Sequence, residues 1–208
     1  MTQLSHAFVG AVVAIITAIV VVTGVSVRAQ DGRIIHVSNI EELYAAVNDP
    51  ENAGRRIVLA PGTYSLDPTQ ANGGRLEFQQ DMTIVGQRGD AGAVVIDASN
   101  LPSASYALGG LFMTGAVRMG RGSNTLEWLT VQGAVNGSAG VETDLPAGPD
   151  ATIVRVVHIV AQGNSRGIDV RHLGPAFNGH VLRAILRDNE ARRNRDFGIR
   201  IVNTLAGC

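Results

Sequence analysis

Charged residues capable of chemistry recur at fixed places in the second half of the chain. They belong to a short phrase, a glycine followed by alternating apolar and polar residues, which begins at Gly140, Gly167 and Gly198. Carboxylates and guanidinium groups gathered in this way can form a polar groove for a charged ligand. Aligning the three copies puts Glu142, Asp169 and Arg200 in one outward column and Asp144, Arg171 and Val202 in the next.

Two interpretations of these columns stay open. Equivalent residues of stacked parallel strands lie about 4.8 Å apart, so a carboxylate can pair with a guanidinium group on the next strand. On an exposed face such a pair contributes about 0–1 kcal/mol to stability. One interpretation is a solvated face with charge pairs between strands, and the other is a groove that binds substrate.

Histidines are the other candidates, because an imidazole can exchange a proton near neutral pH. His158 lies inside a predicted strand, and we expect it to point outward beside Thr130 of the preceding repeat. His172 and His180 lie at the edges of predicted loops. None has a visible partner in the sequence, so a structural or merely exposed histidine is the alternative at each position.

The repeats indicate which elements must position these side chains. The copies follow one another after 27 and 31 residues, and an asparagine precedes each of them, Asn136, Asn164 and Asn194. Self-similarity at this period is typical of stacked architectures, because one unit cannot bury its apolar face alone. The alternation of apolar and polar residues has the period of a strand. We therefore predict a coil of β-structure in which Ile168 and Val170 point inward.

Upstream of the repeats, the sequence predicts one helix and a series of short strands. Ser38 and Glu41 have the spacing of a capping box, and Pro50 prevents the helix from continuing. The apolar stripe of this helix consists of Ile40, Leu43, Tyr44 and Val47. Strands are expected at 56–60, 61–66, 75–78, 82–86, 93–97, 116–119, 126–131, 153–160 and 181–186. Residues 100–110 are expected to form a loop, and residues 189–195 a turn with outward side chains rather than a helix.

A family resemblance supports this architecture. The helix leading into RRIVLAPGTYSL and the later phrase DMTIVGQRGDAGAVVIDAS resemble the opening turns of right-handed parallel β-helix proteins of the pectin-lyase-like superfamily. The resemblance covers nearly all of residues 30–208. It implies an all-β fold, a single-stranded right-handed parallel β-helix of about five turns with a short N-terminal capping helix. The cap is needed because the first turn would otherwise expose an apolar cross-section and unpaired strand edges.

The resemblance also implies an activity, the β-elimination or hydrolysis of an acidic polysaccharide on the outer sheet. Lyases of this superfamily commonly use an arginine or a lysine, often with Ca²⁺ held by aspartates. Elimination needs these groups because the sugar proton becomes acidic only when the adjacent carboxylate charge is masked. The chain has no lysine, so the role falls to Arg171. The catalytic candidates are then Arg171, Asp169 and His158, and the substrate-binding candidates are Glu142, Asp144, Arg200 and His172.

Whether the chain is an enzyme stays open at this point. The tryptophan-isoleucine-aspartate-histidine run and the arginine-proline-arginine pattern of pectate lyases do not occur in the sequence, and neither do the adjacent aspartates of the hydrolases. The alternative is a non-catalytic surface protein, a stalk or an adhesin, that uses the β-helix as a rigid scaffold.

Composition narrows the classes of partner and cofactor. The formal net charge of −1 gives no reason to expect nucleic acid or an anionic membrane surface as a partner. All 17 basic residues are arginine, which excludes a lysine base, a Schiff base and a P-loop lysine within this chain. The single cysteine, Cys208, cannot form an internal disulfide. No Cys/His cluster has the spacing of a metal site, so the sequence identifies no metal-binding or cofactor-binding residues. The cofactor stays open, and Ca²⁺ is implied by the family resemblance alone.

The two ends of the chain carry separate predictions. Residues 7–27 contain no charge and are long enough to span a bilayer, and Val27-Arg28-Ala29 resembles a signal-peptide cleavage site. We predict that residues 1–29 are a signal peptide or a membrane anchor, and that the protein is secreted, periplasmic or on the cell surface. It would contact a membrane only through this segment if the segment is uncleaved. After Ile199 to Val202 nothing covers the last strand, and an open strand edge invites aggregation, so we expect either a longer β-helix or a covering partner.

Overall fold

The computed structural model describes residues 34–102, 106–108, 111–113, 115–135, 137–143, 151–173 and 181–204. The predicted signal or anchor segment, residues 1–29, lies outside this described part. Within it, no helix has the length and apolar character needed to cross a membrane.

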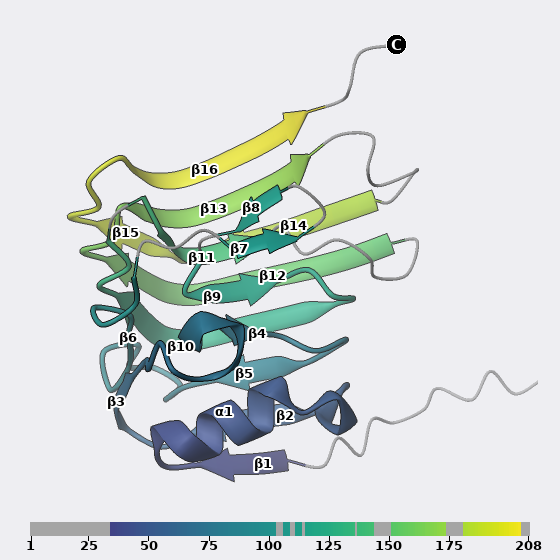
Figure 1. The fold of residues 1–208 in the computed structure, drawn as a ribbon, viewed down its shortest axis with the longest axis vertical. Coiled ribbons are helices and arrows are strands. Elements are labelled where there is room, and N and C mark those ends of the chain that lie inside the picture. The colour runs from purple at the N-terminus through teal and green to yellow at the C-terminus, as the bar shows by residue number, and fades with distance from the viewer. Residues whose placement is uncertain are drawn as a thin grey trace, which may run out of the picture. The chain divides into compact units, whose positions relative to one another are not determined.

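Two parallel sheets make up the described part of the chain, which passes from one sheet to the other and back (Figure 1). Sheet A contains β1 (Ile34–Val37), β2 (Arg56–Leu59), β3 (Gly62–Ser65), β5 (Thr83–Val85), β6 (Val94–Asp97), β10 (Asn124–Gln132), β12 (Ala151–Gln162), β14 (Val181–Arg187) and β15 (Glu190–Arg192). Sheet B contains β4 (Leu76–Glu77), β9 (Val117–Met119), β11 (Ala139–Thr143), β13 (Arg166–Leu173) and β16 (Phe197–Thr204). Every pairing within these two sheets is parallel. The prediction of an all-β fold built from stacked parallel strands is confirmed.

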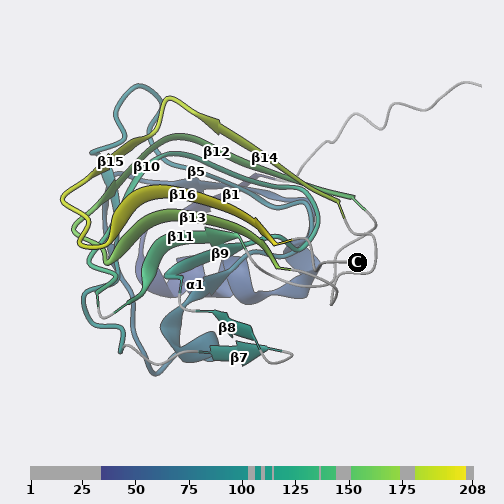
Figure 2. The ribbon, with the colours of Figure 1, turned by 90° about the horizontal axis from the view of Figure 1, so that it is seen from above.

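The core lies between the two sheets, which form separate layers when seen from above (Figure 2). Ile168 and Val170 point inward from β13 and are 0% and 3% exposed, as the strand period predicted. Their neighbours in the core include Val141, Leu126, Val131, Val156 and Ile159. Because alternate residues of a strand face opposite sides, Asp169 between them must lie on the outer side of sheet B.

One helix lies at the lower end of the stack in Figure 1. This helix, α1 (Ile40–Asn48), buries Leu43 and Val47 completely. Its N-cap is Asn39, whose side chain accepts the backbone N–H of Glu42, while the Glu42 carboxylate accepts from the N–H and the hydroxyl of Ser38. The capping box is therefore one residue later than predicted from Ser38. Two short 3₁₀ turns, η1 (Pro50–Asn52) and η2 (Ala71–Gly74), follow.

Sheet A bends along a line of residues in the left-handed backbone region. Trp128, His158 and Asp188 have φ values of 58°, 54° and 54° and occupy equivalent positions on successive strands. Beyond this bend lies what we call the second half of sheet A: β3, β6, the ends of β10 and β12, and β15. The bend thus gives the chain a third flat flank beside sheet B.

Two local predictions need correction. Residues 100–110 are not only loop, because β7 (Tyr106–Leu108) pairs in antiparallel fashion with β8 (Leu111–Met113). Residues 189–195 contain β15 and no helix, as expected, but the Asn194 side chain is not outward. It donates to the carbonyl of Ala161 and accepts the N–H of Asn164, one strand away. The backbone groups of the turn need these partners, and an inward amide supplies both a donor and an acceptor.

Candidate functional site

The outer side of sheet B carries a continuous row of charged residues. The register pairs Glu142 with Asp169 and Asp169 with Arg200, so the column predicted from the repeated phrase is confirmed. The same column continues through Arg118 to Glu77 on the two preceding strands. We call these five residues the ionic row.

The ionic row is buried, which the sequence did not predict. Glu142, Asp169 and Arg118 are each 0% exposed. Figures 1 and 2 together place the β7–β8 hairpin on the outer side of sheet B, and the Gly115 N–H after it donates to Glu142 Oε2 at 2.6 Å. A Cβ on Gly115 would lie 2.4 Å from the Glu142 Cβ, so only glycine permits this approach. The segment that follows β6 therefore covers the face that was expected to be solvated.

Two arginines hold the neighbouring carboxylates of Glu142 and Asp169 together. Like charges directly opposite each other on paired strands are destabilising. Arg166 lies between them, with Nη1 2.6 Å from Asp169 Oδ2 and Nη2 3.7 Å from Glu142 Oε1. Arg171 pairs with Glu142 on the other side, and its Nε is 3.6 Å from Asp169 Oδ2. Two cations from one strand thus compensate two buried anions.

The ends of the ionic row reach solvent through two arginines. Arg200 is 37% exposed and donates through Nε and Nη2 to the two oxygens of Asp169, at 2.8 and 2.6 Å. These hydrogen bonds raise the pKa of Arg200 above its ordinary value. Its guanidinium carbon also lies 4.3 Å from the centre of the Phe197 ring. At the other end, Arg121 is 39% exposed and donates to Glu77 Oε1 at 2.9 Å.

This arrangement suits charge recognition better than proton transfer. Asp169 accepts hydrogen bonds from Arg166 and Arg200, so its lone pairs are engaged. Arg171 lies against two carboxylates, so its guanidinium group is engaged as well. Among the described residues the cluster brings five guanidinium groups to three carboxylates. Arg121 and Arg200 are the most exposed of these guanidinium groups, at 39% and 37%, whereas Arg171 is 13% exposed.

His158 lies on a different sheet from the other catalytic candidates. It sits on β12 in sheet A, where its ring stacks on Trp128 with centroids 3.8 Å apart, and its Nε2 is 3.6 Å from Asp188 Oδ2. The expectation that it lies beside Thr130 is wrong, because Thr130 pairs with Val160. The reason is that equivalent positions on β10 and β12 are 30 residues apart while those on β11 and β13 are 27 apart. The structure does not bring His158 together with the ionic row.

The structure gives little information on the remaining candidate residues. His172 lies on β13, where it pairs with Asn203. Asp144, His180 and Cys208 lie outside the described residues, and so does Asn136.

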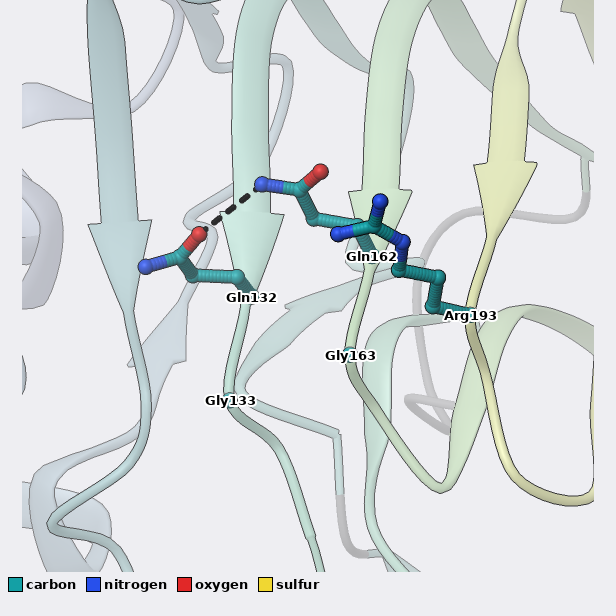
Figure 3. A pocket seen from close by; sticks show the side chains of 5 residues that line it. All are labelled: Gln132, Gly133, Gln162, Gly163 and Arg193. Atoms are coloured by element: carbon teal, nitrogen blue, oxygen red, sulfur yellow. Dashed lines mark hydrogen bonds between the residues drawn. The ribbon is translucent and has the colours of Figure 1, made fainter.

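A second polar feature, which the sequence analysis missed, lies on the second half of sheet A. Gln132, Gly133, Gln162, Gly163 and Arg193 line an open pocket of about 300 Å³ (Figure 3). The sequence signal for it was a glutamine followed by a glycine, repeated after 30 residues. Outward amides on adjacent strands stack into a ladder, just as the charges do on sheet B.

A metal site of the kind that the family resemblance implies does not fit these residues. Ca²⁺ takes six to eight oxygen ligands, whereas the carboxylates of Glu142 and Asp169 are already engaged by arginines. The described part of the chain contains no group of three His, Cys, Asp or Glu side chains placed to hold a metal ion. In comparisons with known proteins, no family model, no curated sequence and no solved structure matches this chain.

Proposed function

We propose that this chain is an exported right-handed parallel β-helix protein that binds an acidic polysaccharide on the outer side of sheet B. The fold part of the proposal rests on the repeated glycine phrase and on the alternation of the chain between two parallel sheets. Export rests on the uncharged segment at residues 7–27 and the cleavage-site pattern that follows it.

The observation that carries the binding proposal is the pair of partly exposed arginines, Arg200 and Arg121, at the two ends of the ionic row. Guanidinium groups bind carboxylates with two parallel hydrogen bonds, and a uronate polymer offers one carboxylate on each sugar. Arg200 and Arg121, the two partly exposed arginines of the cluster, would make the first contacts. Glu142, Asp169, Arg166 and Arg171 would hold these contacts in place.

We propose that sheet B binds the polymer without cleaving it, so an assay for elimination products is the second test of the proposal. An arginine base must lose a proton, whereas guanidinium groups are not deprotonated in proteins, and the guanidinium group of Arg171 is held by Glu142 and Asp169. Hydrolysis needs a carboxylate that can exchange a proton with substrate or water, and the three carboxylates of the row are buried and paired. We expect binding without formation of unsaturated or shortened products.

The test is a titration of the exported protein with polygalacturonate at low and high salt. Arg200→Gln and Arg121→Gln should each weaken binding about fivefold at low salt, as expected for the loss of one partly exposed ion pair. The matched control is Arg187→Gln, which removes a 68% exposed arginine of sheet A that pairs with Asp188. Equal loss in all three variants would indicate non-specific attraction and contradict the proposed surface. Release of unsaturated sugar, followed by ultraviolet absorbance, would replace the binding proposal with a lyase.

A scaffold role is the second candidate, and a specific observation favours it. The ionic row crosses five strands and is buried along most of its length, so it ties the stack together along its axis. A stalk should bind no acidic polymer at any salt concentration. Such a result would select the scaffold and reject the polysaccharide proposal.

A further inference from the structure

The pocket on the second half of sheet A is separate from the ionic row. Its walls are the ends of β10 and β12, and its far side is Arg193, which follows β15 (Figure 3). Gln132 pairs in register with Gln162, and Gln162 with Arg192. The lining therefore spans three neighbouring strands, a length of about 10 Å at the spacing of parallel strands.

The amides of the ladder offer spare donors. Gln132 donates from Nε2 to Asp97 at 3.2 Å, and Gln162 donates from Nε2 to Gln132 Oε1 at 3.0 Å. The remaining acceptor, Gln162 Oε1, receives Arg192 Nε at 2.8 Å. Each amide nitrogen carries two N–H groups and uses one of them in the ladder. Each amide oxygen likewise accepts one hydrogen bond in the ladder and has two lone pairs, so one N–H group and one lone pair of each amide remain for a ligand.

Arg193 adds a cation. Its side chain is exposed and extends toward Gln162 in Figure 3. No carboxylate among the described residues forms an ion pair with it, since Glu190 pairs with Arg192 and Asp196 with Arg195. Its guanidinium group has five N–H donors in a planar fork.

The opposite end of the ladder carries an anion. Partial burial favours the neutral form of Asp97, but hydrogen bonds from Ser99 and Gln132 outweigh that effect and hold the pKa of its carboxyl below the ordinary value. The polar groups around the pocket thus run from the carboxylate of Asp97, through the amides of Gln132 and Gln162, to the guanidinium group of Arg193. A ligand that fits this order carries a negative group at one end and hydroxyl donors at the other.

We propose that this pocket binds a carboxylate-bearing sugar, a uronate unit, with its carboxylate on Arg193 and its hydroxyls on the Gln132 and Gln162 amides. Bidentate pairing with a guanidinium group suits a planar carboxylate. The spare amide donors suit hydroxyl oxygens. A volume of about 300 Å³ lies at the small end of ligand pockets and suits one or two sugar units.

The floor of the pocket is open because it is made of glycine. Gly133 and Gly163 have φ values of 77° and 63°, and Arg193 takes the equivalent position on the next strand with φ 54°. A Cβ added at Gly163 meets no atom within 4 Å. Arg193 shows that this backbone position accepts a residue with a side chain, so Gly163→Leu would obstruct the pocket without a steric clash, at the cost of the backbone strain that a side chain meets at φ +63°.

The experiment is a titration of the exported protein with galacturonate, followed by NMR of its backbone amides, with galactose as the neutral match. We expect shifts at Gly133, Gly163 and their neighbours. Arg193→Gln should weaken galacturonate binding about tenfold or more, as for the loss of a hydrogen bond to a charged group, while galactose is affected much less. Gly163→Leu should abolish binding of both sugars. Arg195→Gln, an exposed arginine that pairs with Asp196, should change nothing.

Three outcomes would overturn the site: no shifts with galacturonate up to its solubility, shifts away from the two glycines, or equal binding by wild type and Arg193→Gln. The inference does not depend on the surface proposed for sheet B. Titration of the same variants with polygalacturonate separates the two. If Arg193→Gln retains polymer binding and loses galacturonate binding, the result supports both the sheet B surface and the pocket on sheet A. If Arg200→Gln binds the polymer as tightly as wild type, only the sheet B surface is rejected.

Discussion

The ionic row of sheet B and the amide ladder of sheet A follow the same geometric rule and end in opposite environments. The amide ladder is the register column of Asp97, Gln132, Gln162 and Arg192. In both, parallel strands in register place equivalent outward residues one above another. Glu142 and Asp169 in the row are 0% exposed, whereas the ladder ends at Arg192, which is 50% exposed. The difference arises from the segment after β6, which covers sheet B and leaves the second half of sheet A open.

This difference teaches what a stacked polar column can do. Where another segment of the chain covers a polar column, every charge in it needs a partner, because an unpaired buried charge is very costly. The row meets this need with arginines on both sides. Where the column is exposed to solvent, water can accept from the unused amide N–H groups, so the ladder can keep these groups for a ligand. We therefore expect substitutions at the buried residues of the row to cost stability, and substitutions in the ladder or at the exposed end of the row, Arg200, to cost binding.

The largest effect should come from the centre of the row. Asp169→Asn removes a negative charge that pairs with Arg166 and Arg200, and breaking a buried pair in this way costs about 3–5 kcal/mol. Chemical denaturation measures the loss. Asp188→Asn, at a 58% exposed carboxylate, is the control and should cost less than about 1 kcal/mol. Equal costs for the two variants would mean that the row is not buried.

An intermediate effect is expected at the turn between the two regions. Asn164 is 2% exposed, accepts the N–H of Ala134 and donates to the carbonyl of Val131. Asn164→Ala leaves two buried backbone groups without partners, at a cost of about 2–3 kcal/mol. Thermal unfolding of this variant beside Asn194→Ala, which makes the same bonds on the terminal turn, should show the larger loss for Asn164. The reverse order would show that the turns are not equivalent.

A small effect on stability is expected in the ladder. Gln162→Ala removes hydrogen bonds to Gln132 and Arg192 that are open to water, so it should cost about 0.5–1 kcal/mol. A denaturation curve measures this cost. A loss as large as that of Asp169→Asn would remove the contrast between the two regions.

The smallest effect is a pH dependence that belongs to the ladder. The pKa of Asp97 lies below its ordinary value of 3.8, so its ionised form stabilises the folded state. This contribution is complete above the ordinary value and is lost as pH falls through the folded pKa. Asp97→Asn should therefore be less stable than wild type at neutral pH, and the gap should close in strong acid. A gap that widens on acidification would contradict the assigned direction.

Much of this contrast could be predicted from the sequence, and the part that could not has a physical cause. The strand period gave the inward positions of Ile168 and Val170 and the column of Glu142, Asp169 and Arg200. The residues around Glu77 and Arg118 show the same alternation, so these two residues could also have been assigned to the column from the sequence. The predicted neighbour of His158 was wrong because the turn after Gln132 is three residues longer than the equivalent turn after Gln162.

The burial of the row was beyond the sequence. Residues 100–110 have the composition of an ordinary loop, and the position of the β7–β8 hairpin over sheet B (Figures 1 and 2) goes with a close approach at Gly115. Single-chain patterns predict which side of a strand a residue faces and do not predict what covers that side. The pocket was missed for a related reason, since two Gln-Gly pairs acquire meaning only once β10 and β12 lie in register.

The most direct test of the account is hydrogen exchange of the backbone amides with and without polygalacturonate. Because β16 is the outermost strand of sheet B and carries Arg200, bound polymer should slow exchange in β16 and in the turn that carries Arg121. Protection in β16 that disappears in Arg200→Gln is the predicted result. Protection that spares β16, or no protection at any polymer concentration, would contradict the proposal that sheet B binds acidic polysaccharide.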